Sequence, residues 1–230
     1  MKARVITISG HEYSERMAQR CISTAATHGL EVELFPAVTE KNVQEIMQQE
    51  NLRWSWADNN TKETVCAYTS LQQFPYRAKN VLTKMACSMS HYLLWKECAI
   101  SNEPMLILEH DAVFVRPLPG IEFNGAIQIN DPCGGGYRGK EHSSTMTQRG
   151  SEGTHPLTRK REHDSRIPDG FSGNSAYIVK PWAAEKFIRA YKKYGVWPND
   201  ATICLQLFPW LEEYYPFITI VKQSQSTSTA

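Results

Sequence analysis

The sequence predicts an α/β fold with a doubly wound sheet that is mixed but mostly parallel and is flanked by helices. Segments rich in β-branched and apolar residues alternate along the chain with segments of helical periodicity, as in strand–helix–strand units. Residues 105–108 form a continuous apolar run, which is typical of a central strand covered on both faces. A chain of 230 residues is long enough for one such domain. We therefore expect a single domain over residues 1–222 and a polar tail at 223–230.

The start of the chain predicts two pairs of strand and helix. Both strand segments are rich in β-branched and apolar residues, and Pro36 marks the end of the second strand or an edge position. The first helix opens at Ser14 and stops before Gly29, a residue type that often follows a helix. We expect strands at 4–9 and 31–38 and helices at 14–28 and 41–50.

The middle of the chain contains the most strongly predicted helix, at residues 82–101. Apolar residues recur there at helical spacing on two opposite sides, which predicts a helix buried between two layers. The preceding segment, 51–79, is polar with scattered aromatic residues, and we expect irregular structure with room for one short helix.

The second half predicts further strands and helices around one unusual segment. Residues 134–170 hold 7 of the 13 glycines and few apolar residues, so this segment cannot bury a core of its own. We expect it to lack regular structure and to be either a flexible lid or disordered. Outside it, we expect strands at 112–115, 126–129, 174–179 and 217–221 and helices at 181–194 and 200–208.

Composition excludes several classes of protein. The net charge of +1 provides no overall field for binding nucleic acid or an anionic membrane. No uncharged apolar run approaches the ~18 residues of a membrane span. The first apolar run is too short for a secretory signal, and the six cysteines form no CxxC pair, so we expect reduced thiols and a cytoplasmic location. No P-loop, dinucleotide-binding or GxSxG motif occurs.

Two carboxylates after the apolar run 105–108 are the sharpest chemical signal. Open α/β sheets bind ligands at the carboxyl ends of their strands, and Glu109 and Asp111 are two residues apart, so an extended chain points both to one side. Paired carboxylates suit Mg²⁺ or Mn²⁺ bound together with diphosphate oxygens. Acidic residues also end strands and cap turns for structural reasons alone, and both interpretations remain open.

Other polar residues have weaker claims to a role. His91 could bind substrate or be a hydrogen-bonded core residue. Cys87 lies four residues before it and could complete half of a zinc site, but the chain offers no second pair with the required short spacing. Arg16 could reach a phosphate, and Asp200 could be a general base, although a helix start explains Asp200 equally well. The basic run 159–161 is either a solvated loop or a contact for an anionic acceptor.

Several short segments occur in the order seen in one known family. They are 4–8 with 14–16, 90–91 with 94–95, 106–111 (Leu-Ile-Leu-Glu-His-Asp), 173–179, 184–187, Asp200, Gln223, Ser226 and Thr227. Together they resemble glycosyltransferase family 25, which includes lipopolysaccharide galactosyltransferases and the collagen hydroxylysine galactosyltransferase domain.

The resemblance implies a GT-A-like fold and a hexosyltransferase. A UDP-sugar, carrying galactose or glucose, would be the donor, and Mn²⁺ or Mg²⁺ would assist inverting transfer to a hydroxyl of a glycan, glycolipid or protein acceptor. By similarity, Glu109 would contact the sugar nucleotide and join Asp111 in binding the metal. Arg16, Ser90 and His91 would help to hold the donor. Asp200 would be the catalytic base.

The chain also departs from the family pattern. His110 stands where the family usually has a third acidic residue, and Ser9 and Gly10 replace the usual Asn-Leu after the first strand. Residues 134–170 match nothing in the family, and we interpret them as a lid on the acceptor side. His110 motivates an alternative, a catalytically inactive GT-A-like module that binds glycans or nucleotide sugars. A metal-dependent phosphohydrolase is a third hypothesis, disfavoured because a two-metal site would need a second cluster of ligands.

Overall fold

The computed structural model of the protein describes residues 1–57, 63–75, 80–134 and 138–221. The predicted tail at 223–230, with Gln223, Ser226 and Thr227, lies outside the described residues. Within the described part of the chain, no helix combines the length and the apolar character needed to cross a membrane.

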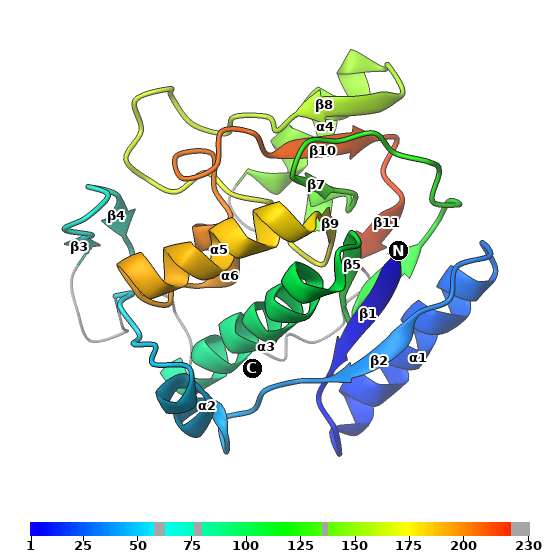
Figure 1. Ribbon diagram of the computed structural model, residues 1–230. Helices are drawn as coiled ribbons and strands as arrows, with labels where there is room; N and C mark the ends of the chain where they lie inside the picture. The colour runs from blue at the N-terminus through cyan, green and yellow to red at the C-terminus, as the bar shows by residue number, and fades with distance from the viewer. Residues whose placement is uncertain (58–62, 76–79, 135–137, 222–230) are drawn as a thin grey trace.

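A seven-stranded sheet lies at the centre of the structure (Figure 1). β9 runs antiparallel to both of its neighbours and β8 runs antiparallel to β10, whereas the other pairings are parallel. Five of the seven strands therefore point the same way, which confirms the predicted mixed, mostly parallel sheet. In sheet order the strands are β2 (Glu33–Pro36), β1 (Lys2–Thr7), β5 (Met105–Glu109), β9 (Ala176–Val179), β7 (Ala126–Gln128), β10 (Glu212–Tyr215) and β8 (Gly153–Pro156).

Helices and two short two-stranded sheets surround the central sheet. One small sheet pairs β6 (Ala112–Phe114) with β11 (Thr219–Val221), and the other pairs β3 (Thr64–Val65) with β4 (Gln72–Gln73). The helices of the described residues are α1 (Glu12–Ala26), α2 (Val43–Gln49), α3 (Val81–Ser101), the 3₁₀ helix η1 (Pro132–Gly134), α4 (Gly139–Arg149), α5 (Pro181–Tyr194) and α6 (Asn199–Thr202).

Each face of the sheet packs against its own layer of helices. Side chains alternate along β5, so that Ile107 joins the apolar core with α3 and α5, whereas Leu108 joins a second core with α1. Figure 1 shows α3 and α5 side by side, with α1 on the other side of the sheet. This two-sided covering matches the doubly wound arrangement predicted from the sequence and is consistent with a GT-A-like fold.

Local sequence sets the ends of the helices next to the site. Asn80 caps α3, since its side-chain oxygen accepts a hydrogen bond of 2.9 Å from the backbone N–H of Leu82. α3 ends at Asn102, which adopts a left-handed conformation with φ of 54°. α5 starts at Pro181, whose missing N–H costs nothing in the first turn, and is followed by Gly195 at φ of 89°.

The expectation that residues 134–170 lack regular structure is wrong. This segment contains α4 and β8, and β8 pairs with the edge of the central sheet at β10. His142 of α4 hydrogen-bonds Glu213 of β10 at 2.5 Å, and both side chains are buried. These contacts with β10 stabilise the segment, which explains how it folds with few apolar residues of its own.

Other predicted elements agree with the structure only in part. The helix expected at 200–208 is only the four-residue α6, because the chain turns back to pair with Gly170: the N–H of Leu205 donates to the carbonyl of Asp169. The strand expected at 217–221 is present as β11, which pairs with β6 outside the central sheet. β3 and β4, within 51–79, were not expected from the sequence, and neither was β10, whose Glu and Tyr residues form no apolar pattern.

Candidate active site

The predicted carboxylates lie at the carboxyl edge of the central sheet. β5 is an inner strand between β1 and β9, and its last residue is Glu109. The backbone N–H of Glu109 donates to the carbonyl of Ser175 at 2.8 Å, which fixes the end of the strand. β1 and β2 end at the same edge, with Ile6 paired to Glu109. This edge is where open α/β sheets bind ligands.

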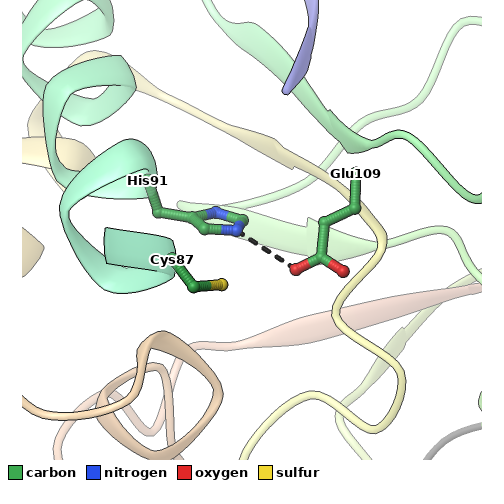
Figure 2. Close-up of side chains that lie close together, drawn as sticks. All are labelled: Cys87, His91 and Glu109. Atoms are coloured by element: carbon green, nitrogen blue, oxygen red, sulfur yellow. Dashed lines mark hydrogen bonds and ion pairs between the residues drawn. The ribbon is translucent and has the colours of Figure 1, made fainter. Parts of the chain in front are cut away.

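His91 holds the Glu109 side chain in place (Figure 2). His91 lies on α3 with its side chain 1% exposed, and its Nε2 is 3.3 Å from Oε1 of Glu109. Its Nδ1 is 2.9 Å from the hydroxyl of Tyr177, which also accepts a hydrogen bond from the indole N–H of Trp95. Both ring nitrogens of His91 therefore have a partner, the Tyr177 hydroxyl at Nδ1 and the Glu109 carboxylate at Nε2.

The electrostatics of Glu109 follow from this contact. Burial alone would raise the pKa of its carboxyl group, but the hydrogen bond and charge of His91, together with the charges of His110 and Lys84, outweigh burial and lower the pKa. The carboxylate is 30% exposed, so a ligand can still reach it. Glu109 is therefore a fixed, ionised group at the edge of the sheet.

Asp111 is a more deeply buried carboxyl group beside Glu109. It is 4% exposed, and its Oδ1 has no hydrogen-bond partner among the described residues. Burial, followed by the negative charge of Glu109, raises its pKa to about 7, although a hydrogen bond from Ser175 opposes this. The Ser175 hydroxyl also donates to Oε2 of Glu109 at 3.4 Å.

This pair fits a hard divalent cation. Two neighbouring carboxylates repel each other in a site of low polarity, and the unpaired oxygen of Asp111 offers a ligand atom that no described protein group uses. Carboxylate oxygens are the ligands that Mg²⁺ and Mn²⁺ prefer. Glu109 and Asp111 are therefore suited to the cation that the sequence predicted.

His110 and Arg16 lie toward α1. His110 is buried, burial lowers its pKa, and its Nδ1 is 3.3 Å from the hydroxyl oxygen of Ser14. The Tyr13 ring meets His110 edge-on at 6.3 Å, and the guanidinium of Arg16 lies 5.5 Å from the Tyr13 ring centre. Arg16 is exposed and also pairs with Glu12 at 3.8 Å. The structure thus connects Arg16 to the carboxylate turn through two aromatic rings rather than by direct contact.

Asp200 approaches the site from the side of α6. It adjoins Asn199, whose Oδ1 accepts a hydrogen bond of 3.7 Å from the Cys87 thiol. The negative charges of Glu109 and of Asp200 both contribute, after burial, to raising the pKa of Cys87. Asp200 is therefore the sequence neighbour of a residue that contacts Cys87, and its charge and that of Glu109 both act on this thiol.

Ser90 has a different environment from His91, its neighbour in the sequence. Its hydroxyl donates to the carbonyl of Ala86 at 2.9 Å and accepts from the backbone N–H of Val38, also at 2.9 Å. It therefore ties α3 to the segment after β2.

The sequence analysis did not single out several residues that surround the carboxylates. Lys84 is one of these residues: it lies at helical spacing from the predicted Cys87 and His91 on α3, and its charge acts on both Glu109 and Cys87. This spacing was the available signal for Lys84. Nothing local marks Ser175 and Tyr177, because they reach Glu109 and His91 only after the chain has folded.

Comparisons with known proteins give a family and one similar structure. A sequence model of the family described as glycosyltransferase family 25 (LPS biosynthesis protein) matches residues 8–125, which is just over half of the chain and includes Glu109 and Asp111. No curated protein sequence matches the chain. Among solved structures, the crystal structure of mouse xyloside xylosyltransferase 1 in its apo form is similar with a TM-score of 0.37 and 6% identity, covering 91% of this chain and 83% of that one.

Proposed function

The chain belongs to glycosyltransferase family 25 and is a glycosyltransferase; from this premise, we propose that its site transfers galactose or glucose from a UDP-sugar, with inversion, to an acceptor hydroxyl. The observation that carries the proposal is the pair of carboxylates at the end of β5, with Glu109 fixed by His91 and Asp111 left with an unpaired buried oxygen. The acceptor belongs to the class of glycans, glycolipids or proteins.

Glu109 and Asp111 would hold a divalent cation, Mn²⁺ or Mg²⁺, whose positive charge stabilises the departing diphosphate. The protein itself fixes these carboxylates before substrate arrives. Trp95 and Tyr177 orient His91, and His91 orients Glu109. Ser175, just before β9, contacts the carboxylates as well. Such preorganisation avoids reorienting charges during the reaction.

Asp200 is our candidate for the base. The new bond joins the acceptor oxygen to the anomeric carbon, the bond from that carbon to the UDP oxygen breaks, and the acceptor proton passes to the Asp200 carboxylate. The acceptor would enter from the side of Lys160. Burial lowers the pKa of Lys160 below its ordinary value, although the charges of Asp169 and Asp200 oppose this effect. Lys160 also lines a cavity of about 510 Å³ together with Arg138, Arg161 and Arg166.

Calorimetric titration with UDP tests the donor site. We expect wild type to bind UDP with Mn²⁺ and to lose binding in chelator, and Asp111→Asn to bind at least about tenfold more weakly, a cost near 1.4 kcal/mol. Glu103→Gln is the matched control, because Glu103 also carries a carboxylate but precedes β5 at the opposite edge of the sheet.

Incubation with UDP-galactose and UDP-glucose then separates the rival functions. Hydrolysis of one of them by wild type, and not by Asp200→Asn, supports transfer and identifies the donor. UDP binding with no turnover of either sugar would favour the inactive binding module. Hydrolysis of the diphosphate to UMP and a sugar 1-phosphate, with no free sugar, would favour a phosphohydrolase. A wild-type protein that binds no UDP would make the carboxylates structural.

A further inference from the structure

Three side chains of different chemistry converge beside the carboxylate pair (Figure 2). The sulfur of Cys87, a ring nitrogen of His91 and a carboxylate oxygen of Glu109 all lie within 4.8 Å of one another. A hard cation prefers oxygen ligands alone, whereas Zn²⁺ binds cysteine sulfur, histidine nitrogen and carboxylate oxygen. We propose that the chain binds one Zn²⁺ through Cys87, His91 and Glu109, and that bound zinc withdraws Glu109 from the donor site.

Rigid elements position all three ligands. Cys87 and His91 are one turn apart on α3, so their side chains share a face of the helix. α3 is a 21-residue helix packed into the main core, and Glu109 ends an inner strand. The sequence alone could not complete this set, because Glu109 comes from a strand rather than from a second short-spaced pair.

The surroundings of His91 are those of a metal ligand. Metal-binding histidines usually hydrogen-bond a second group through the other ring nitrogen, and Tyr177 contacts Nδ1 while Nε2 points to Glu109. Binding zinc through Nε2 places the ring proton on Nδ1, where the hydroxyl oxygen of Tyr177 accepts it. Cys87 binds as a thiolate, and its proton leaves to the solvent.

The geometry requires only a small contraction. Ligand atoms around a tetrahedral zinc ion lie about 3.5 Å apart, given metal–ligand distances of about 2.0–2.3 Å. The 3.3 Å between His91 Nε2 and Glu109 Oε1 already meets this spacing. The Cys87 sulfur lies within 4.8 Å of the other two ligand atoms, and to bind zinc it would give up Asn199, its partner in a hydrogen bond of 3.7 Å. The fourth position stays open for water.

Cobalt binding tests the site without any nucleotide. Co²⁺ replaces Zn²⁺ in such sites and gives a thiolate-to-metal absorption band in the near ultraviolet. We expect the metal-stripped chain to develop this band with one equivalent of Co²⁺ and to lose it when Zn²⁺ is added. Cys87→Ser should abolish the band, whereas Cys133→Ser should retain it, because Cys133 is an exposed thiol of η1.

Two further variants keep this test decisive if Cys87→Ser does not fold. Tyr177→Phe and Glu109→Gln retain the thiol, so they should keep the band while weakening cobalt affinity by about tenfold or more. Circular dichroism checks that each variant is folded. The zinc site is wrong if wild type gives no band, if the band survives in folded Cys87→Ser, or if both retained-thiol variants bind cobalt as tightly as wild type.

The effect of zinc on the donor site rests on the proposed function and has its own measurement. One equivalent of Zn²⁺ should weaken UDP binding in the presence of Mn²⁺ by at least about tenfold in wild type, since both metals use Glu109. Zinc should have no such effect in Cys87→Ser. Equal weakening of UDP binding in both proteins would place zinc on Glu109 and Asp111 and would overturn the proposed competition through Cys87. A failed cobalt titration, by contrast, leaves the transferase proposal intact.

Discussion

At the scale of single residues, Ser90 shows how a family position can act through the backbone. Its hydroxyl accepts the buried N–H of Val38 while donating to the carbonyl of Ala86. Ser90→Ala leaves that N–H without a partner, so we expect the free energy of unfolding to fall by about 1–3 kcal/mol. Equilibrium unfolding in urea measures the change.

Ser23→Ala is the matched control for this prediction. Ser23 also donates to a carbonyl one turn back, that of Gln19 at 2.8 Å, but it is exposed and accepts from no distant backbone group among the described contacts. Its loss should change stability by less than about 0.5 kcal/mol. If Ser90→Ala instead unfolds like wild type and loses UDP binding, then Ser90 contacts the donor, as the family resemblance implies.

The two neighbours Ser90 and His91 also show what sequence can predict about a site. Successive residues of a helix point about 100° apart, so one faces Val38 and the other faces Glu109. Glu109 and Asp111 were predictable because the chain itself brings them together. The Tyr177 contact spans 86 positions, so no local pattern could reveal it.

At the scale of elements, Glu50 connects α2 to α3. Its carboxylate accepts hydrogen bonds from Tyr92 at 3.0 Å and from Lys96 at 2.5 Å. Burial alone would raise the pKa of Glu50, but these contacts outweigh it and lower the pKa below the ordinary value of 4.5. A lowered folded-state pKa adds stability above the unfolded-state pKa, and this contribution disappears as the pH falls through the folded-state value.

Glu50→Gln should therefore destabilise the protein at pH 7 by up to about 1 kcal/mol, because the ion pair is partly exposed. The difference from wild type should shrink below pH 4.5 and vanish in stronger acid. Urea unfolding at several pH values measures it. Glu45→Gln is the control, because it removes an exposed charge whose hydrogen-bond partner, Gln49, lies on α2 itself. A pH-dependent loss of stability of equal size in Glu45→Gln would contradict the prediction.

Elements differed in how well the sequence predicted them. α5 occupies the predicted range from Pro181 to Tyr194, because both its first-turn proline and its following glycine are local signals. β10 was not predicted from the sequence. Its buried Glu213 contacts His142 and Thr158, which are far from it in the sequence. Elements that depend on distant polar partners give no periodic apolar pattern.

The contacts of Glu213 also restrict the proposed acceptor lid. They anchor α4 and the end of β8 to β10, and Asp169 fixes the far side through the N–H of Leu205. Between these anchors lies the loop 159–168, which Gln206 and Gln72 hold through hydrogen bonds to its backbone carbonyls. We propose that this loop closes over an acceptor by exchanging those contacts. Its basic residues make it a substrate for trypsin.

Trypsin cleavage after residues 159–161 and 166 should therefore slow several-fold when UDP-sugar and Mn²⁺ are both present. Mass spectrometry of the fragments locates and times each cut. Cleavage after Arg20 in α1 is the internal control, because α1 contributes to the opposite layer and its cleavage should report only general stabilisation. Equal slowing at both places, or none at the loop, would argue against a lid.

At the scale of the whole molecule, the two-layer architecture was predictable but the direction of β9 was not. Alternation of strand and helix segments predicts helices on both faces, as found around β5. β9 is buried at all four positions, and such an apolar run has the same pattern in either direction. The antiparallel placement of β9 between β5 and β7 depends on how the chain returns after residues 134–170.

Both layers contribute to the site, which leads to the last prediction. His110 and Ser14 belong to the side of α1, whereas His91 and Cys87 come from α3 on the other face. Nucleotide bound between them should therefore stabilise both layers at once. At UDP concentrations near 100 times Kd, linkage adds about 2.7 kcal/mol. For a chain of 230 residues, we expect the single unfolding transition to rise by roughly 5–11 °C.

Differential scanning calorimetry with UDP and Mn²⁺ together, with each alone, and with UDP in chelator measures this shift. Only the combination should give the full rise, because the carboxylates repel the diphosphate unless a cation lies between them. A full shift with UDP in chelator would mean that the donor site binds UDP without a cation. Two transitions, of which only one moves, would mean that the layers unfold separately, and residues 1–222 would then not behave as the single domain that the sequence predicts.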